Sequence, residues 1–146
     1  VIRTPYGHEF ARQSMKDALS EAVGDRLNDA TLDKVVRNAS SSWTQSGHLS
    51  GRGRKTRQKV DATPAATTYA LLLGFAVGRR GRLLFETPWA AILDTGPDDL
   101  IDAAVDAKRL GLLDLKQSGS MIDVSFPALF TDKERELIHG SHRQAG

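Results

Sequence analysis

Residues 87–113, TPWAAILDTGPDDLIDAAVDAKRLGLL, contain two consecutive helix starts. The hydroxyl of Thr87 can accept a hydrogen bond from a free backbone amide, and Pro88 suits the first helical position because its missing N–H has no partner there. Pro97 opens a second helix in the same way, and aspartates follow it where the helix dipole favours negative charge. Gly111 can end that helix in the left-handed conformation. The stretch therefore predicts a short helix, a tight turn and a longer helix.

Further elements are predicted on both sides of this stretch. Residues 63–78, TPAATTYALLLGFAVG, begin with the same Thr-Pro signal and are apolar on most sides, which indicates a central buried helix. Downstream, LLDLKQ and MIDVSF alternate apolar and polar residues around a turn at 118–120, which predicts a β-hairpin. The residues expected on its inner face are Leu113, Leu115, Ile122, Val124 and Phe126.

The order of these elements over residues 63–130 resembles a winged helix-turn-helix domain. The step from LGLL, residues 110–113, into the first strand of the hairpin is similar to the end of the third helix in that superfamily. The resemblance implies a DNA-binding domain, usually with its third helix in the major groove. A small α+β domain with an unrelated hairpin is the alternative.

The N-terminal part of the chain predicts two amphipathic helices, over about residues 7–23 and 28–43. Apolar residues recur at helical spacing on one face of each helix. They are Phe10, Met15, Ala18, Leu19, Ala22 and Val23 in the first, and Leu32, Val35, Val36, Ala39 and Trp43 in the second. The two helices can form a hairpin, but they need a third element to close a core.

We therefore expect a mainly α fold with a small β-hairpin wing (α+β), in which an N-terminal helical hairpin is followed by a winged helix-turn-helix. The expected parts are an N-terminal helical segment at 1–43, a basic loop or arm at 44–62, a winged-helix domain at 63–130, and a short C-terminal helix and tail at 131–146. Thr131 and Glu134 have the spacing of a capping box at the start of that last helix.

Composition excludes several classes of protein. The chain of 146 residues has no cysteine, so disulfides, thiolate catalysis and cysteine-based metal sites are ruled out. Its longest strongly apolar stretch, residues 69–77, is less than half of the about 20 residues that span a membrane. No apolar segment typical of a signal peptide occurs near the start of the sequence. We expect a soluble cytoplasmic protein that does not bind membranes.

The net charge of +2 hides an uneven distribution along the chain. Residues 1–60 carry +5, residues 61–97 carry 0 and residues 98–146 carry −3. No acidic residue occurs from position 34 to position 60, and glycine alternates with basic residues at the start of GRGRKTRQK, residues 51–59. An uneven charge distribution of this kind gives information about binding partners rather than about the fold.

A basic arm of this composition can follow a phosphate backbone or enter a minor groove, because glycine leaves the chain free to bend. We predict that the arm contacts nucleic acid, with double-stranded DNA as the leading candidate. The predicted contact residues are Arg52, Arg54, Lys55, Arg57 and Lys59, His48 in the same segment, and Arg79, Arg80 and Arg82 after the central helix. The alternatives are a solvated loop without a partner, or a loop that docks on the acidic face of another protein or of a second copy of this chain.

The predicted third helix argues against the usual docking in the major groove. Its outward face is acidic and carries Asp98, Asp99, Asp102 and Asp106. Carboxylates are repelled by phosphate, and among the base edges of that groove they accept a hydrogen bond only from cytosine. We expect this face to bind a protein partner instead.

The sequence predicts no catalytic site. His139 and His142 could share a metal ion with Glu134 or Glu136, but a surface pair without metal is favoured. The acidic helix face is also expected to hold no metal, and GRGRKT matches neither a Walker loop nor a dinucleotide fingerprint. We predict a non-enzymatic protein with no cofactor and no metal.

A more specific resemblance covers residues 43–127. The segments W-TQSGHLSGRGRK-R, YALLLGF, GRLLFETPWAAILD, AKRLGLLDL and IDVSFP follow one another in an order that resembles small accessory proteins encoded with bacterial phage-exclusion (BREX-type) systems. The resemblance implies a role in antiviral defence within a larger multi-protein system. No catalytic residue carries over from it.

These features predict a DNA-binding winged-helix protein that contacts the phosphate backbone through its basic arm and serves as an accessory component of phage defence. The alternative function is a protein–protein adaptor, in which the acidic third helix and the basic arm assemble a larger complex. A homo-oligomer is also left open.

Overall fold

The computed structural model describes residues 1–134, and the chain divides into two compact units after Val60. The described part is mainly helical and contains two small antiparallel sheets of two strands each. The prediction of a mainly α protein with a small β component is therefore confirmed at this level. No helix within residues 1–134 is both long enough and apolar enough to cross a membrane.

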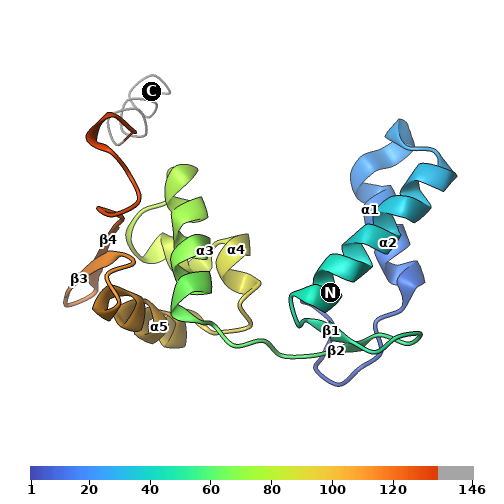
Figure 1. Ribbon diagram of the computed structural model, residues 1–146, viewed down its shortest axis with the longest axis horizontal. Coiled ribbons are helices and arrows are strands. Elements are labelled where there is room, and N and C mark those ends of the chain that lie inside the picture. Colours follow the sequence, from blue (N-terminus) through green and yellow to red (C-terminus); the bar gives the residue numbers. More distant parts are fainter. Residues whose placement is uncertain (135–146) are drawn as a thin grey trace. The chain divides into compact units, whose positions relative to one another are not determined.

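The N-terminal unit, residues 1–60, consists of two helices that lie side by side and a small hairpin (Figure 1). Its elements are α1 (Arg12–Val23), the 3-10 helix η1 (Gly24–Arg26), α2 (Asp29–Gln45), β1 (Leu49–Ser50) and β2 (Thr56–Arg57). Asn28 caps α2 by accepting a hydrogen bond from the amide of Thr31 at 2.8 Å. The first helix begins later than predicted, because residues 7–10 pair with the hairpin instead.

Both helices bury apolar residues on their predicted faces, but Ala18 and Ala22, which were expected on the inner face of the first helix, are exposed. Met15 of α1 packs against Leu32 and Val36 of α2, and all three are buried. Partly buried residues around them are Val1, Phe10, Leu19, Val23, Ala39 and Trp43. The hairpin supplies the third element that the helices need, since β1 packs on α2 and buries Leu49.

Residues 44–62 do not form the open arm that their glycines and arginines suggested. The antiparallel pairs are Leu49 with Arg57 and Ser50 with Thr56. On the other edge of β2, the amide of Arg57 donates to the carbonyl of His8 at 2.9 Å, and the amide of Gly7 donates to the carbonyl of Arg57 at 2.8 Å. The backbone of β2 is thus hydrogen-bonded on both sides, which fixes it within the N-terminal unit.

The loop at 51–55 between the two strands is tightly curled. Gly51 has a φ of +103°, and a Cβ at this position would overlap the carbonyl oxygen of Arg54. The Lys55 ammonium donates to the carbonyl of Gly51 at 2.6 Å across the same loop. Only glycine fits this position without strain, so Gly51 serves a defined turn rather than a flexible arm.

Replacing Gly51 with alanine is expected to destabilise the protein by about 1–3 kcal/mol, because the new Cβ meets backbone in a conformation that L residues rarely adopt. Gly53→Ala in the same loop is the matched control, since a Cβ there would meet open space. Urea denaturation of both variants measures the difference. Equal free energies of unfolding for the two variants would show that the loop is not held in this turn.

The C-terminal unit, which begins at Asp61, has the predicted order of helices followed by a hairpin. Its elements are α3 (Pro64–Ala76), the 3-10 helix η2 (Gly81–Glu86), α4 (Pro88–Ala91), α5 (Pro97–Arg109), β3 (Asp114–Ser118) and β4 (Met121–Ser125). Both Thr-Pro starts act as predicted. Thr63 caps α3 by accepting from the amide of Ala66, and Thr87 caps α4 by accepting from the amide of Ala90. The helix η2 is an addition to the predicted order.

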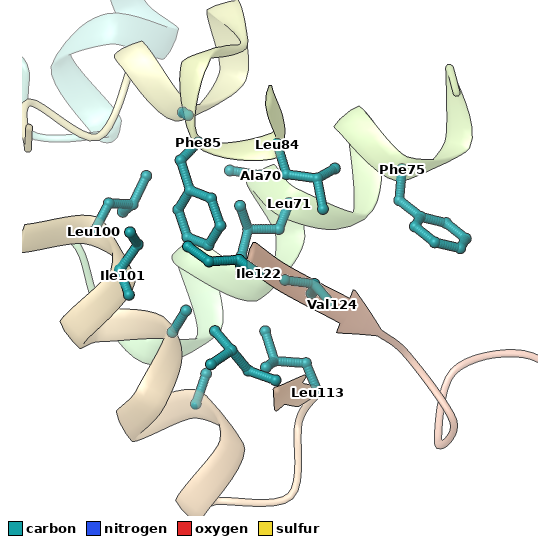
Figure 2. Close-up of a cluster of buried hydrophobic side chains, with 14 of the residues drawn as sticks. Ala70, Leu71, Phe75, Leu84, Phe85, Leu100, Ile101, Leu113, Ile122 and Val124 are labelled. Atoms are coloured by element: carbon teal, nitrogen blue, oxygen red, sulfur yellow. The ribbon is translucent and has the colours of Figure 1, made fainter. Parts of the chain in front are cut away.

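The core of the C-terminal unit lies between α3, η2, α5 and the hairpin (Figure 2). Leu71, Leu84 and Leu100 come from three of these elements and have no exposed surface. The hairpin residues expected to face inward are all buried, namely Leu113, Leu115, Ile122, Val124 and Phe126. Burial of these apolar side chains is the main stabilising contribution to the unit.

The predicted capping box is present at the end of the described chain. The amide of Thr131 donates to the Glu134 carboxylate at 2.9 Å, and the amide of Glu134 donates to the Thr131 hydroxyl at 3.3 Å. The Thr131 amide and the Thr131 hydroxyl, which donates to the same carboxylate at 2.8 Å, lower the pKa of the Glu134 carboxyl below its usual value. The rest of the helix predicted there, from residue 135, lies outside the described residues.

Candidate nucleic-acid interface

A cleft of about 390 Å³ lies within the N-terminal unit. It is bounded by the start of α1 with the residues just before it, by one face of α2, and by the loop at 51–55. The lining residues are Glu9, Phe10, Ala11, Arg12, Met15, Arg37, Ser40, Ser41, Thr44, Gln45, Arg52, Gly53, Arg54 and Lys55. Three stretches that are far apart in sequence thus meet at one concave surface.

The α2 wall of the cleft is polar. Its residues are Arg37, Ser40, Ser41, Thr44 and Gln45, and their spacing of three or four residues places them on one face of the helix. The Thr44 hydroxyl donates to the carbonyl of Ser40 at 2.8 Å, and the Gln45 amide group donates to the Ser41 hydroxyl at 3.3 Å. The Ser41 hydroxyl proton can therefore still be donated to a ligand.

The loop wall of the cleft carries three basic side chains that differ in their bonding partners. Arg54 forms an ion pair with Glu9 at 3.2 Å, although its own side chain is 85% exposed and the pair is therefore weak. Lys55 donates to the carbonyl of Gly51. Arg52 is exposed and has neither an ion-pair nor a hydrogen-bond partner in the described part of the chain.

The cleft is strongly cationic. Five basic side chains line it, against a single carboxylate, Glu9, which is already paired with Arg54. Arg12 and Arg37, like Arg52, are exposed and have no partner among residues 1–134. Three guanidinium groups at one concave surface are thus available to an anion, and their planar donors suit phosphate.

An apolar section completes the lining. Phe10, Ala11 and Met15 contribute it, and Met15 also belongs to the buried core between the two helices. The amide of Phe10 donates to the carbonyl of Lys55 at 2.8 Å, which ties this section to the loop wall. The cleft therefore offers an apolar surface beside its basic one.

Two of the predicted contact residues are buried, and the prediction is corrected for both. Arg57 has no exposed surface. Its guanidinium donates to the carbonyl of Val1 at 3.2 Å and to that of Gln58, and it lies 5.1 Å from the ring centroid of Tyr6. His48 is buried against the edge of Trp43, and its Nδ1 is 2.8 Å from the Ser46 hydroxyl. Neither side chain is accessible to a phosphate.

The remaining predicted contacts do not line this cleft. Lys59 is exposed in the N-terminal unit, and Arg79, Arg80 and Arg82 belong to the C-terminal unit. Arg82 forms an ion pair with Asp98 at 2.7 Å. Arg80 lies 3.7 Å from the ring centroid of Phe75 and donates to its carbonyl, and burial lowers the pKa of this arginine.

Arg79 is exposed. It borders a second hollow, of about 370 Å³, on the C-terminal unit, which is also lined by Val77, Leu83, Glu86, Thr87, Pro88 and Trp89. Val77 and Leu83 are more than half exposed there. This hollow is mainly apolar and holds one basic side chain beside one acidic one, so it lacks the charge excess of the N-terminal cleft.

The acidic surface of α5 is partly neutralised within the unit. Asp98 pairs with Arg82, and Asp106 pairs with Arg109 at 2.8 Å. Asp99 and Asp102 are exposed and have no partner in residues 1–134. These last two carboxylates form the acidic surface that is open to a binding partner.

Arg12 and Arg37 line the cleft but were absent from the predicted contact set. A signal for Arg37 was present, since it shares a polar stripe with Ser41 and Thr44 on the side of the helix away from Leu32 and Val36. No comparable signal pointed to Arg12, because its place in the cleft depends on how α1 packs beside the loop.

The structure provides no metal centre in its described part: residues 1–134 contain no group of three or more His, Asp or Glu side chains that could hold an ion. The histidine pair His139 and His142 lies outside the described residues.

No family model matches the sequence, and comparisons with curated proteins and with solved structures gave no significant match. The resemblances to winged-helix domains and to phage-exclusion accessory proteins therefore stay predictions. The functional proposal depends on the geometry of the cleft.

Arg57→Ala is expected to destabilise the protein by about 1.5–3 kcal/mol, because a buried charged donor to two carbonyls is lost. Arg52→Ala removes the same side chain from an exposed site without a partner, and is expected to change stability by less than about 0.5 kcal/mol. Thermal and urea unfolding of both variants measure this contrast. If Arg57→Ala is as stable as Arg52→Ala, Arg57 does not have the structural role assigned to it.

Proposed function

We propose that the protein is a non-enzymatic nucleic-acid-binding protein and that the cleft of the N-terminal unit is its contact surface. The observation that carries the proposal is the convergence of Arg12, Arg37 and Arg52, all without partners in residues 1–134, on one concave surface. Lys55 and Arg54 add to the positive charge there. Unpaired guanidinium groups gathered in this way favour a polyanion.

The physical basis is the affinity of these groups for phosphate. Guanidinium groups bind phosphate oxygens with two parallel hydrogen bonds, and the released counterions make binding depend on salt. Hydroxyls such as that of Ser41 also contact phosphates in nucleic-acid complexes. The contact surface proposed here is a preformed cleft rather than a flexible arm, so less conformational entropy is lost on binding.

For the C-terminal unit we propose a winged-helix fold, supported by the order of α3, α4, α5 and the β3–β4 hairpin. In this fold α5 would be the recognition helix, but Asp99 and Asp102 on its exposed surface disfavour a phosphate-lined groove. The nucleic-acid contacts are therefore assigned to the N-terminal unit. The phage-defence role implied by the second resemblance belongs to the same proposal, and a genomic position among defence genes would support it.

The double variant Arg37→Ala/Arg52→Ala is expected to weaken nucleic-acid binding by about tenfold or more, since two charge-assisted phosphate contacts are lost. The slope of log K against log salt should become shallower by about 1.4 on single strands or about 1.8 on duplex DNA. Fluorescence anisotropy over a series of salt concentrations measures both quantities.

Lys34→Ala is the matched control for this experiment. Lys34 is an exposed cation on α2 that does not line the cleft. Its replacement therefore removes a positive charge from the same helix as Arg37 but leaves the cleft unchanged. The proposal fails if Lys34→Ala weakens binding as much as the double variant does, or if the wild-type chain binds neither duplex nor single strands at low salt.

A protein adaptor is the second candidate function. The observation in its favour is the unpaired acidic pair Asp99 and Asp102 on α5, which suits a partner with a basic surface. Asp99→Asn/Asp102→Asn is expected to release such a partner from a purified native complex, whereas Asp123→Asn, an exposed change on β4, retains it. Retention of the partner by the double variant, seen in quantitative co-purification, would count against the adaptor.

A further inference from the structure

The N-terminal cleft has the size of a small-molecule site rather than of a duplex groove. Its volume of about 390 Å³ is near the lower end of the range for ligand pockets, about 300–1,000 Å³. A duplex could touch the rim of such a cleft only through its backbone, because its bases are stacked and paired. A flexible single strand can place one of its nucleotides inside the cleft, and a free nucleotide can enter it as a whole.

The lining of the cleft contains both kinds of surface that a nucleotide needs, one apolar and one cationic. Phe10, Ala11 and Met15 form an apolar section, while Arg37 and Arg52 belong to the basic section. A nucleobase has an apolar face that stacks on aromatic rings, whereas its phosphate needs cationic donors. Phosphate binding alone would not require the apolar section.

The two sections are held in place without a ligand. The hydrogen bond from the Phe10 amide to the Lys55 carbonyl joins the apolar section to the loop. The Arg54–Glu9 ion pair spans the same junction, and the turn at Gly51 sets the course of the loop that carries Arg52. These contacts preorganise the cleft, so less conformational entropy is lost when a ligand binds.

We propose that the cleft binds one nucleoside monophosphate unit, with its base against Phe10 and Met15 and its phosphate held by Arg37 and Arg52. The inference rests on the proposed function and narrows its ligand to single-stranded nucleic acid, which would be the source of that nucleotide. A free nucleotide presents the same base and the same phosphate as a nucleotide of a single strand. Duplex DNA does not, because its bases are unavailable to the apolar section.

The test uses the full chain and labelled oligonucleotides of about ten nucleotides at about 0.15 M ionic strength. The single strand is expected to bind about tenfold more tightly than the duplex of the same sequence. A single strand of abasic sites keeps every phosphate but is expected to bind about tenfold more weakly than the normal strand. This comparison leaves the protein unchanged, so it does not depend on the folding of a variant.

Two variants separate the roles of the sections. Phe10→Leu is expected to weaken single-strand binding about tenfold and to leave the salt slope unchanged, because it removes stacking but no charge. Tyr69→Leu, at an exposed aromatic residue of the C-terminal unit, is the control and should bind like the wild type. Thermal unfolding of each variant shows that a loss of affinity is not a loss of fold.

Competition identifies the source of the bound unit. Adenosine monophosphate is expected to displace the strand at concentrations at which inorganic phosphate does not. This result would support the inference. Equal binding of duplex, normal strand and abasic strand would overturn it and leave the proposed function intact. Binding of the free nucleotide without any binding of strands would support the nucleoside-phosphate site and overturn nucleic-acid binding. If neither strands nor nucleotides bind, both proposals fail.

Discussion

The N-terminal unit depends on the backbone pairing of residues 7–10 with residues 55–57. This pairing satisfies the outer edge of β2, whose other edge pairs with β1, and it places Arg57 out of contact with solvent. The same pairing brings the start of α1 beside the loop at 51–55 and so forms the cleft. Without it, the residues before α1 would not be joined to the hairpin, and the cleft would lose one of its walls.

Burial divides the basic residues of this unit into two groups with opposite roles. The Arg57 guanidinium donates hydrogen bonds to the carbonyls of Val1 and Gln58, because a buried charged group is stable only when it is hydrogen-bonded. Arg37 and Arg52 are exposed and have no partner within the described residues. The net charge of the segment does not distinguish the groups, although only the second is available to a ligand.

The C-terminal unit places its charges differently. Its helix starts are capped by local Thr-Pro signals, and its core closes on the inner face of the β3–β4 hairpin. Arg82 is paired with Asp98, and Arg80 is packed on Phe75, so two of its three clustered arginines are engaged internally. Most of the positive charge after α3 is therefore engaged by side chains of the same unit.

The sequence by itself determined most of the α-helices, the caps of α3 and α4, and the β3–β4 hairpin with its buried face, because these features follow from local signals such as Thr63, Thr87 and the alternation around residues 118–120; the start of α1 and the helix η2 did not follow from such signals. It also located the excess of positive charge in the first 60 residues. Only the tertiary structure decided that residues 49–57 form a hairpin, that Arg57 and His48 are buried, and that Arg12 lines the cleft. The physical reason is that burial and strand pairing join residues about 50 positions apart, such as Val1 and Arg57, and no local pattern encodes such a contact.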